Sequence, residues 1–264
     1  LMCMLAHPDD ETLGMGGPLA RYAAEGVGTY VVTATRGEHG WPDPAQPYPG
    51  PTELGRIREA ELHAAAAVLG IREVQLLDYE DGQLAMADPA PAVASLVAHV
   101  RRVRPQVVTT FAPDGAYGHP DHIAISQLAL TATYCALDPA YRPELGPPHR
   151  VAKFYYWVAY QAEMMEYQAI FGRLSMLVDG VERSSPGWPE WQVTTWIETV
   201  AYRPQVWRAV ACHRTQMPAY GQLAERLADP ACELWRRQAF YRAFSTVNGG
   251  GALEDDLFAG LRPQ

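Results

Sequence analysis

The chain has 264 residues, enough for one large α/β domain, and 48% of them are hydrophobic, which supports a sizeable core. A formal net charge of −9 argues against nucleic acid or an anionic membrane surface as the main partner. The sequence has no run of about 18 apolar residues, so we expect no transmembrane helix. Its four cysteines lack the spacing of a zinc knuckle or disulfide framework, which favours reduced thiols and a cytoplasmic protein.

Strands and helices alternate over the first 137 residues. Short β-rich runs predict strands at 1–5, 28–34, 73–77 and 107–111, and the segments between or after them predict helices over 12–25, 53–69, 92–103 and 123–137. This alternation indicates an α/β fold with a Rossmann-like, mostly parallel sheet flanked by helices. Because the chain opens inside the first strand, we expect a natural N-terminus to be missing.

Beyond residue 138 the pattern loosens, and prolines mark a linker-like loop. The later segments predict strands at 151–158 and 193–201, a loop at 180–189, and helices at 163–172, 205–213 and 234–243. We therefore expect one domain over residues 1–264. Its α/β core would span 1–137, and a C-terminal elaboration over 138–264 would shape the substrate pocket.

A dense polar motif follows the first predicted strand. Ala6-His7-Pro8-Asp9-Asp10-Glu11 places an imidazole and three carboxylates within five residues at the end of a buried strand. A desolvated carboxylate is costly unless it is paired or bound to a metal. Ligands of open α/β sheets sit at this end of the strands, and His with Asp is a ligand pair suited to zinc.

A second polar motif, Tyr117-Gly118-His119-Pro120-Asp121-His122, lies between the predicted strand 107–111 and the helix at 123. Two ligands from the first loop and one from the second would leave an open position for water, as a catalytic zinc site requires. The alternative for either loop alone is helix capping by its aspartates. Two such clusters on strand-to-helix loops favour one shared metal site.

Together the two motifs resemble the PIG-L/LmbE-like family of zinc-dependent N-deacetylases, whose members remove acyl groups from amino sugars and related amides. Supporting signals are Arg58 within Arg-Glu-Ala-Glu-Leu, the pair Asp81-Gly82, and the late His213-Arg-Thr-Gln216. The resemblance is strongest over residues 1–137. It implies one Zn²⁺ per chain, or another divalent metal, with His7, Asp10 and His122 as ligands and Asp9 as the general base for the attacking water.

The second loop is expected to handle the leaving group and the oxyanion. His119 would protonate the leaving amine or stabilise the oxyanion, and Asp121 would raise the pKa of His119 and fix its tautomer. The alternative role of Asp121 is a helix N-cap. Tyr117 is a candidate second oxyanion donor, or else a tyrosine packed on the rim.

Four further residues are candidates for binding the substrate. Arg58 and Asp81 match positions that the resemblance implies for sugar hydroxyls, although either could instead form a structural salt bridge. Glu38 and Gln216 are candidate rim residues. Aromatic residues gather in 37–51 and 138–200, among them Trp41, Tyr48, Tyr156, Trp157, Tyr160, Tyr167, Trp188 and Trp191. Such faces stack on sugar rings or apolar acyl chains, or else serve an interface or core, and we expect specificity to reside in these segments.

The sequence thus predicts a zinc-dependent hydrolase that removes an acetyl or other acyl group from the amide nitrogen of an amino sugar or glycoconjugate, for example one containing N-acetylglucosamine. The alternatives in the same class are an amidase of a thiol-conjugated pseudo-disaccharide and an antibiotic deacylase. The alternative of another class is a non-catalytic α/β module that binds a sugar or nucleotide. The expected partner is a small molecule, without nucleic acid, and a homo-oligomer is compatible with the sequence.

Overall fold

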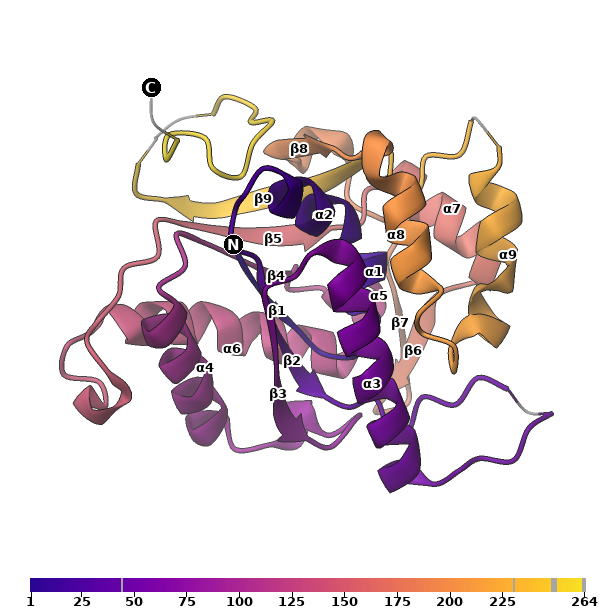
Figure 1. Ribbon diagram of the computed structural model, residues 1–264, viewed down its shortest axis with the longest axis horizontal. Coiled ribbons are helices and arrows are strands. Elements are labelled where there is room, and N and C mark those ends of the chain that lie inside the picture. Colours follow the sequence, from indigo (N-terminus) through magenta and orange to yellow (C-terminus); the bar gives the residue numbers. More distant parts are fainter. Residues whose placement is uncertain (44, 230, 248–250, 263–264) are drawn as a thin grey trace.

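A seven-stranded sheet with the order β3-β2-β1-β4-β5-β9-β8 forms the centre of the protein (Figure 1). The computed structural model describes residues 1–43, 45–229, 231–247 and 251–262. The sheet is mostly parallel, as predicted: the antiparallel pairs are those that β9 forms with β5 and with β8. In sheet order the strands are β3 (Glu73–Tyr79), β2 (Tyr30–Thr35), β1 (Met2–Leu5), β4 (Val107–Phe111), β5 (Lys153–Val158), β9 (Arg237–Ser245) and β8 (Thr195–Glu198).

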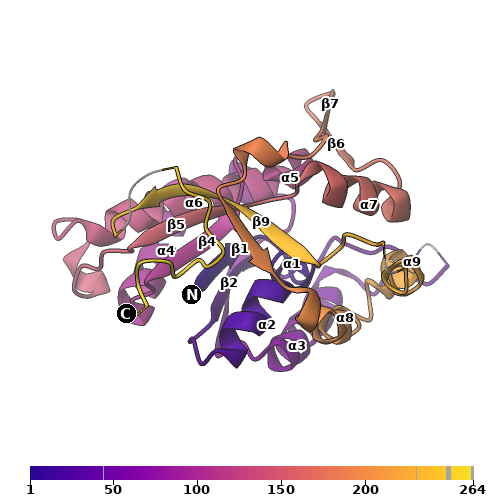
Figure 2. The same ribbon diagram turned by 90° about the horizontal axis from the view of Figure 1, so that it is seen from above.

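Helices cover both faces of the sheet (Figure 2). All residues of β1 and β4 are buried, as is typical of parallel strands that are covered on both sides. One face carries α4 (Pro89–Val103) and α6 (Pro120–Leu137), and the other carries α2 (Gly16–Ala24), α3 (Pro51–Leu69) and α8 (Arg203–Val210). Helix α3 begins with a proline at its first position and is followed by Gly70 at φ 76°, two residues that favour these helix ends.

The remaining elements are short or lie in the second half of the chain. They are α1 (Asp10–Leu13), α5 (Gly115–Gly118), α7 (Gln161–Phe171), α9 (Met217–Leu227), β6 (Ser175–Val178) and β7 (Val181–Ser184), with 3-10 helices at Leu84–Met86, Pro143–Leu145, Glu190–Gln192 and Val200–Tyr202. Three strands of the central sheet, β5, β8 and β9, come from this second half. The C-terminal elaboration is therefore built into the sheet rather than attached beside it.

Two predicted helices differ from the structure. The helix predicted over 234–243 is wrong, because these residues lead into β9, which pairs with β5 on one side and β8 on the other. Two strand partners supply hydrogen bonds that override the helix-forming side chains of this segment. The helix predicted over 12–25 is instead two helices, α1 and α2, which are separated at Gly14 and Met15.

A small hairpin, β6–β7, stands apart from the main sheet and lies in a segment with no predicted strand. Its turn is Asp179-Gly180, with φ 53° and 75°, flanked by Val178 and Val181. An Asp-Gly pair between apolar residues is a strong hairpin signal, so the sequence did contain the information.

All four cysteines are free, as expected for reduced thiols, and Cys3 and Cys232 are buried. Among the residues that the structure describes, no helix combines the length and apolar character needed to span a bilayer.

Candidate metal centre and active site

The two polar motifs meet at one edge of the sheet. Strands β1 and β4 are parallel neighbours, with Met2 opposite Val108 and Cys3 opposite Thr109. Their carboxyl ends therefore lie side by side, and the loop after β1 faces the loop after β4. The first loop turns sharply at Asp9, whose φ of 110° lies in a region that L-residues rarely adopt.

Potential ligand atoms of three residues, His7, Asp10 and His122, converge between these loops. His7 Nδ1 lies 3.3 Å from His122 Nε2. Asp10 lies 3.6 Å from His122 Nε2 through Oδ1 and 3.8 Å from His7 Nδ1 through Oδ2. Ligands about 2.0–2.1 Å from a tetrahedral zinc ion lie roughly 3.3 Å from one another, so this triangle has the size of a zinc site.

Polar contacts of His7, His122 and Asp10 with neighbouring groups orient the potential ligand atoms. His7 Nε2 lies 3.1 Å from Asp81 Oδ1 and 3.3 Å from Asp121 Oδ2. His122 Nδ1 lies 3.2 Å from the Gly115 carbonyl oxygen, and Asp10 Oδ2 accepts the His7 main-chain N–H at 2.7 Å. An acceptor at one ring nitrogen leaves the lone pair of the other for a metal, which is the usual environment of a ligating histidine. The donor set therefore fits a divalent ion.

Electrostatics in this cluster reflect many acidic groups around one imidazole. Burial opposes a charge on His7, but its hydrogen bonds with Asp121 and Asp81 outweigh burial and raise its pKa to about 10. Burial also raises the pKa of Asp10 to about 7, against the opposing effect of His7. A metal ion that used both atoms would have to displace protons, so its binding would depend on pH.

The structure shows a contact of Asp121 that the sequence did not predict. Its carboxylate accepts N–H groups from Gly82 at 2.7 Å and Leu84 at 3.1 Å and contacts His7, so it orients His7, while its charge also raises the pKa of His119. His119 meets Asp121 through the main chain: its Nδ1 accepts the Asp121 N–H at 3.2 Å, which makes His119 the N-cap of α6. The expected helix cap is present, but it is His119 that supplies it.

The electrostatic environment of His119 disfavours its cationic form. Burial and the nearby His7 lower its pKa to about 4, against the opposing effect of Asp121. Its ring centroid lies 4.7 Å from His7, 4.6 Å from His122 and 6.0 Å from Tyr117. The ring nitrogens of His7, His119 and His122 include a set within 4.8 Å of one another. A second such set joins a His7 nitrogen to carboxylate oxygens of Asp81 and Asp121, so His7 belongs to both groups.

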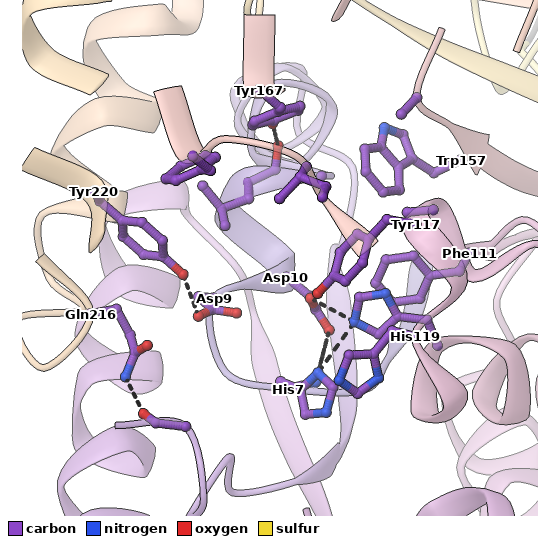
Figure 3. A pocket seen from close by; sticks show the side chains of 18 of the residues that line it. His7, Asp9, Asp10, Phe111, Tyr117, His119, Trp157, Tyr167, Gln216 and Tyr220 are labelled. Carbon is purple, nitrogen blue, oxygen red and sulfur yellow. Dashed lines mark hydrogen bonds and ion pairs between the residues drawn. The ribbon is translucent and has the colours of Figure 1, made fainter. Parts of the chain in front are cut away.

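Two donors hold Asp9, and Figure 3 shows one of them, Tyr220. The Asp9 Oδ2 accepts from Tyr220 Oη at 2.7 Å and from Arg58 Nη2 at 2.8 Å. Both donors use the same oxygen, Oδ2, and Asp9 lines the cavity. Tyr220 lies on α9, 211 positions from Asp9, and no motif in the sequence pointed to it.

Replacing Tyr220 with Phe is expected to lower kcat about tenfold and to leave metal content and KM nearly unchanged. The lost hydrogen bond to a carboxylate has the size that corresponds to this factor, about 1.5 kcal/mol. Steady-state kinetics and metal analysis provide the test. The matched control is Tyr22→Phe, because Tyr22 Oη donates to Asp256 at 2.9 Å far from the cavity, and this change should alter stability but not kcat. A Tyr220→Phe enzyme with full kcat would show that Asp9 needs no support from α9.

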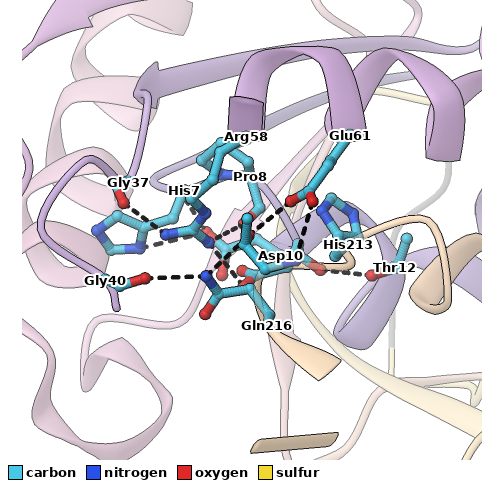
Figure 4. A network of polar contacts seen from close by, with 12 residues as sticks. His7, Pro8, Asp10, Thr12, Gly37, Gly40, Arg58, Glu61, His213 and Gln216 are labelled. Carbon is cyan, nitrogen blue, oxygen red and sulfur yellow. Dashed lines mark hydrogen bonds and ion pairs between the residues drawn. The ribbon is translucent and has the colours of Figure 1, made fainter. Parts of the chain in front are cut away.

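Buried polar residues, among them His213, support the loop after β1 on the side away from the cavity (Figure 4). Glu11 accepts the Asp9 main-chain N–H at 2.9 Å through Oε2 and contacts His213 Nε2 at 2.7 Å through Oε1. Both side chains are fully buried, so Glu11 and His213 support the loop from the interior of the protein. Burial opposes a charge on His213, but Glu11 outweighs it and raises the pKa of this histidine.

The four candidate substrate-binding residues have different environments. Arg58 is 3% exposed and donates to the carbonyl oxygens of Gly37 and Pro8 as well as to Asp9, so its main contacts hold two loops together. Glu38 accepts the Asp81 N–H at 3.0 Å and supports that residue. Gln216 donates to the Gly40 carbonyl oxygen at 2.9 Å. Arg58, Asp81 and Gln216 line the cavity, whereas the described lining does not include Glu38.

A cavity of about 370 Å³ opens above these residues. His7, Asp9, Asp10, Tyr117, His119 and His122 all line it, which brings the predicted catalytic and ligand residues except Asp121 to one surface. The aromatic segment contributes Trp157 and Tyr167, as expected for a binding segment. From the described part of the loop 37–51, Gly40 reaches the cavity, while Trp41 and Tyr48 bond to carbonyl oxygens of the loop itself.

Comparisons with known proteins agree with this site. The sequence model of the PIG-L family, described as GlcNAc-PI de-N-acetylase, matches residues 2–133. A Streptomyces avermitilis protein named 1D-myo-inositol 2-acetamido-2-deoxy-alpha-D-glucopyranoside deacetylase is 36% identical, and the alignment covers 100% of this chain and 97% of that protein.

Solved structures share the fold. A conserved protein of Thermus thermophilus matches with a TM-score of 0.65 and 25% identity, covering 94% of this chain and 96% of that one. The N,N'-diacetylchitobiose deacetylase of Pyrococcus horikoshii matches with a TM-score of 0.68 and 18% identity, covering 91% of this chain and 82% of that one.

The sheet, the two polar loops and the sequence relationship together define the class of this protein, which is an N-deacetylase, a hydrolase of the amide C–N bond. The chain belongs to the PIG-L family of GlcNAc-PI de-N-acetylases, as the resemblance of its two motifs predicted.

Proposed function

We propose that the protein removes the acetyl group from an N-acetylglucosamine unit linked to inositol or to a similar polyol. The observation that carries this proposal is the convergence of His7, Asp10 and His122 beside Asp9 at the floor of one cavity. The deacetylase named for such a substrate in Streptomyces avermitilis, at 36% identity over the whole chain, supports the choice of sugar.

The metal in this proposal is Zn²⁺, held by His7 Nδ1, His122 Nε2 and Asp10. When bound, zinc supplies a Lewis acid that polarises the amide carbonyl and makes water more acidic. Two nitrogen ligands and one carboxylate are a common donor set of catalytic zinc sites. Asp81 and Asp121 keep the His7 ring in the required orientation through Nε2.

Asp9 is the proposed general base. Tyr220 and Arg58 fix its Oδ2, and its Oδ1 accepts a proton from the attacking water. The same carboxyl group can then return that proton to the leaving amine nitrogen, because both events occur on one side of the amide carbon. With Asp9 as both base and acid, His119 is not required to protonate the leaving amine.

His119 is the proposed oxyanion donor. Its Nδ1 accepts the Asp121 main-chain N–H, so the proton of the neutral ring resides on Nε2, which can donate to the developing oxyanion. A pKa of about 4 disfavours the alternative in which a cationic His119 protonates the amine. Tyr117 lines the same cavity and is a second proposed donor, and burial raises the pKa of its hydroxyl, which therefore stays protonated.

Zinc-loaded protein is expected to deacetylate N-acetylglucosaminyl-inositol, and chelation is expected to lower the rate by a factor of about a hundred or more until zinc is restored. The measurement is amine release from a panel of N-acetylated sugars, together with metal analysis. His122→Ala should lose both metal and activity, whereas His63→Ala on the surface of α3 should keep both. A protein that neither retains a metal nor hydrolyses any amide would support the non-catalytic binding module instead.

A further inference from the structure

The wall of the cavity has a polar end and an apolar end. The polar end includes Asp81, Arg58, Gln216 and the main chain of Gly40, which can bind hydroxyl groups. The apolar end consists of six largely hydrophobic side chains, which we call the apolar chamber: Leu13, Trp157, Met164, Tyr167, Phe171 and Leu174. Figure 3 shows Trp157 and Tyr167 on the side of the cavity away from Gln216 and His7. Asp81 contacts His7 Nε2, whereas Trp157 packs against Phe111, whose ring stacks on His122, so the proposed ligands adjoin both ends.

The apolar chamber is a binding surface rather than ordinary core. Protein interiors are close-packed, so empty space against apolar side chains beside an active site is a feature of a ligand pocket. A volume of about 370 Å³ for the whole cavity falls within the range of pockets for drug-sized ligands. An acetyl group would place one methyl in the chamber.

The hydroxyl of Tyr167, the tyrosine of the apolar chamber, is hydrogen-bonded within the protein. Tyr167 Oη donates to the Leu13 carbonyl oxygen at 2.8 Å and accepts from Trp235 Nε1 at 3.2 Å. The ring of Tyr167 therefore offers its carbon face to the cavity. Leu174, Phe171 and Met164 add aliphatic and aromatic surface from α7 and the residues after it. The aliphatic members Leu13, Met164 and Leu174 favour hydrocarbon, whereas the Trp157 Nε1–H has no hydrogen-bond partner among the described residues and is available to a bound ligand.

The geometry points to an N-acyl group longer than acetyl as the occupant of the apolar chamber, an inference that rests on the proposed amide hydrolysis. A trans amide places its nitrogen substituent and its acyl chain on opposite sides of the C–N bond. With the sugar on the nitrogen held by the polar end and the carbonyl carbon beside Asp9, the acyl chain enters the chamber. Hydrolysis breaks the amide C–N bond, joins the water oxygen to the acyl carbon, and releases a fatty acid and the free amine.

The test is a series of N-acyl glucosamines with acetyl, butanoyl, hexanoyl and octanoyl groups, assayed with the zinc-loaded enzyme. We expect kcat/KM to rise with chain length by up to about fourfold per methylene, the gain from moving a CH₂ group out of water, until the chamber is full. N-acetylglucosamine carrying an octyl group on its anomeric oxygen should show no such gain. A gain there, without one from the N-acyl series, would place the chamber on the aglycone side and overturn the inference.

Leu174→Trp should narrow the chamber and lower kcat/KM for the octanoyl substrate at least tenfold, with less than a twofold change for acetyl. The matched control is Leu177→Trp on β6, because Leu177 is 74% exposed and lies outside the described lining. Circular dichroism verifies folding of both variants. Phe171→Ala offers a second test, since it enlarges the chamber and should move the preferred acyl length upward.

Binding to the metal-depleted protein separates this inference from the proposed function. Calorimetric titration should show that N-octanoylglucosamine binds at least tenfold more tightly than N-acetylglucosamine, and that Leu174→Trp removes the difference. Equal affinities, or a kcat/KM that is flat or falls with acyl length while acetyl is cleaved, would overturn the inference and leave deacetylation standing. Tighter octanoyl binding with no hydrolysis of any amide would support the chamber and contradict the proposed function.

Discussion

Replacing Asp9 with Asn is expected to lower kcat by about a factor of 100 to 10,000, the range seen when a general base is removed. The amide oxygen of Asn can still accept from Tyr220 and Arg58, so the loop should keep its shape. What the variant loses is the ability to take a proton from water. Zinc content measured on the same preparation should stay near one ion per chain.

The control is Asp88→Asn, because Asp88 caps α4 at the surface and accepts the Ala90 N–H, a role that Asn can also fill. Its kcat and zinc content should match those of the unmodified enzyme. If zinc is lost from the Asp9→Asn protein in step with activity, Asp9 is a ligand, and the roles of Asp9 and Asp10 must be exchanged.

Glu163→Gln is expected to stabilise the protein at alkaline pH. Glu163 is fully buried on α7, and neither carboxylate oxygen has a hydrogen-bond partner among the described residues. Burial raises its pKa to about 8, well above that of a glutamate in an unfolded chain. The folded state therefore holds a proton that the unfolded state releases above about pH 4.5.

Because the pKa of Glu163 is higher in the folded than in the unfolded state, the stability of the protein falls as the pH rises. Below the unfolded pKa both states are protonated and Glu163 contributes no pH dependence. As the pH rises toward the folded pKa, the free energy of unfolding falls by an amount on the order of 3 kcal/mol. Urea unfolding at pH 5 and pH 8.5 should show this loss in the natural protein and a smaller one in Glu163→Gln. Glu166→Gln, on the same helix, removes pairs with Arg226 at 2.6 and 2.8 Å and should not stabilise at either pH. An identical pH dependence in the natural protein and Glu163→Gln would mean that Glu163 has a partner that neutralises its charge.

Most strands and helices of the first half of the chain, and the location of the site at the ends of β1 and β4, could be predicted from the sequence. Apolar runs that end in His and Asp identified β1 and β4, and parallel pairing of these strands was enough to bring His7 near His122. Local patterns failed where the outcome depended on distant partners. Strand β9 forms because β5 and β8 flank it, and Tyr220 reaches Asp9 across 211 positions.

The contact between Asp121 and His7 could not be predicted from the sequence for a related reason. The spacing of Asp121 from His119 and its position at a helix start were both correct in the sequence, but the direction of its carboxylate was not encoded locally. The N–H groups of Gly82 and Leu84, from the loop after β3, draw that carboxylate toward His7. The loop after β3 therefore decides that the Asp121 carboxylate contacts His7, and sequence spacing alone does not show where that loop lies.

The walls of the cavity are divided along the chain. The proposed base and ligand residues precede residue 123, whereas Met164, Tyr167, Phe171 and Leu174 of the apolar wall lie between β5 and β8. This later segment is nevertheless coupled to the base: α7 packs against α9, and the ring of Phe171 contacts Tyr220, which donates to Asp9. Substitutions that reshape the apolar wall must therefore preserve the position of Tyr220 if the base is to keep its support.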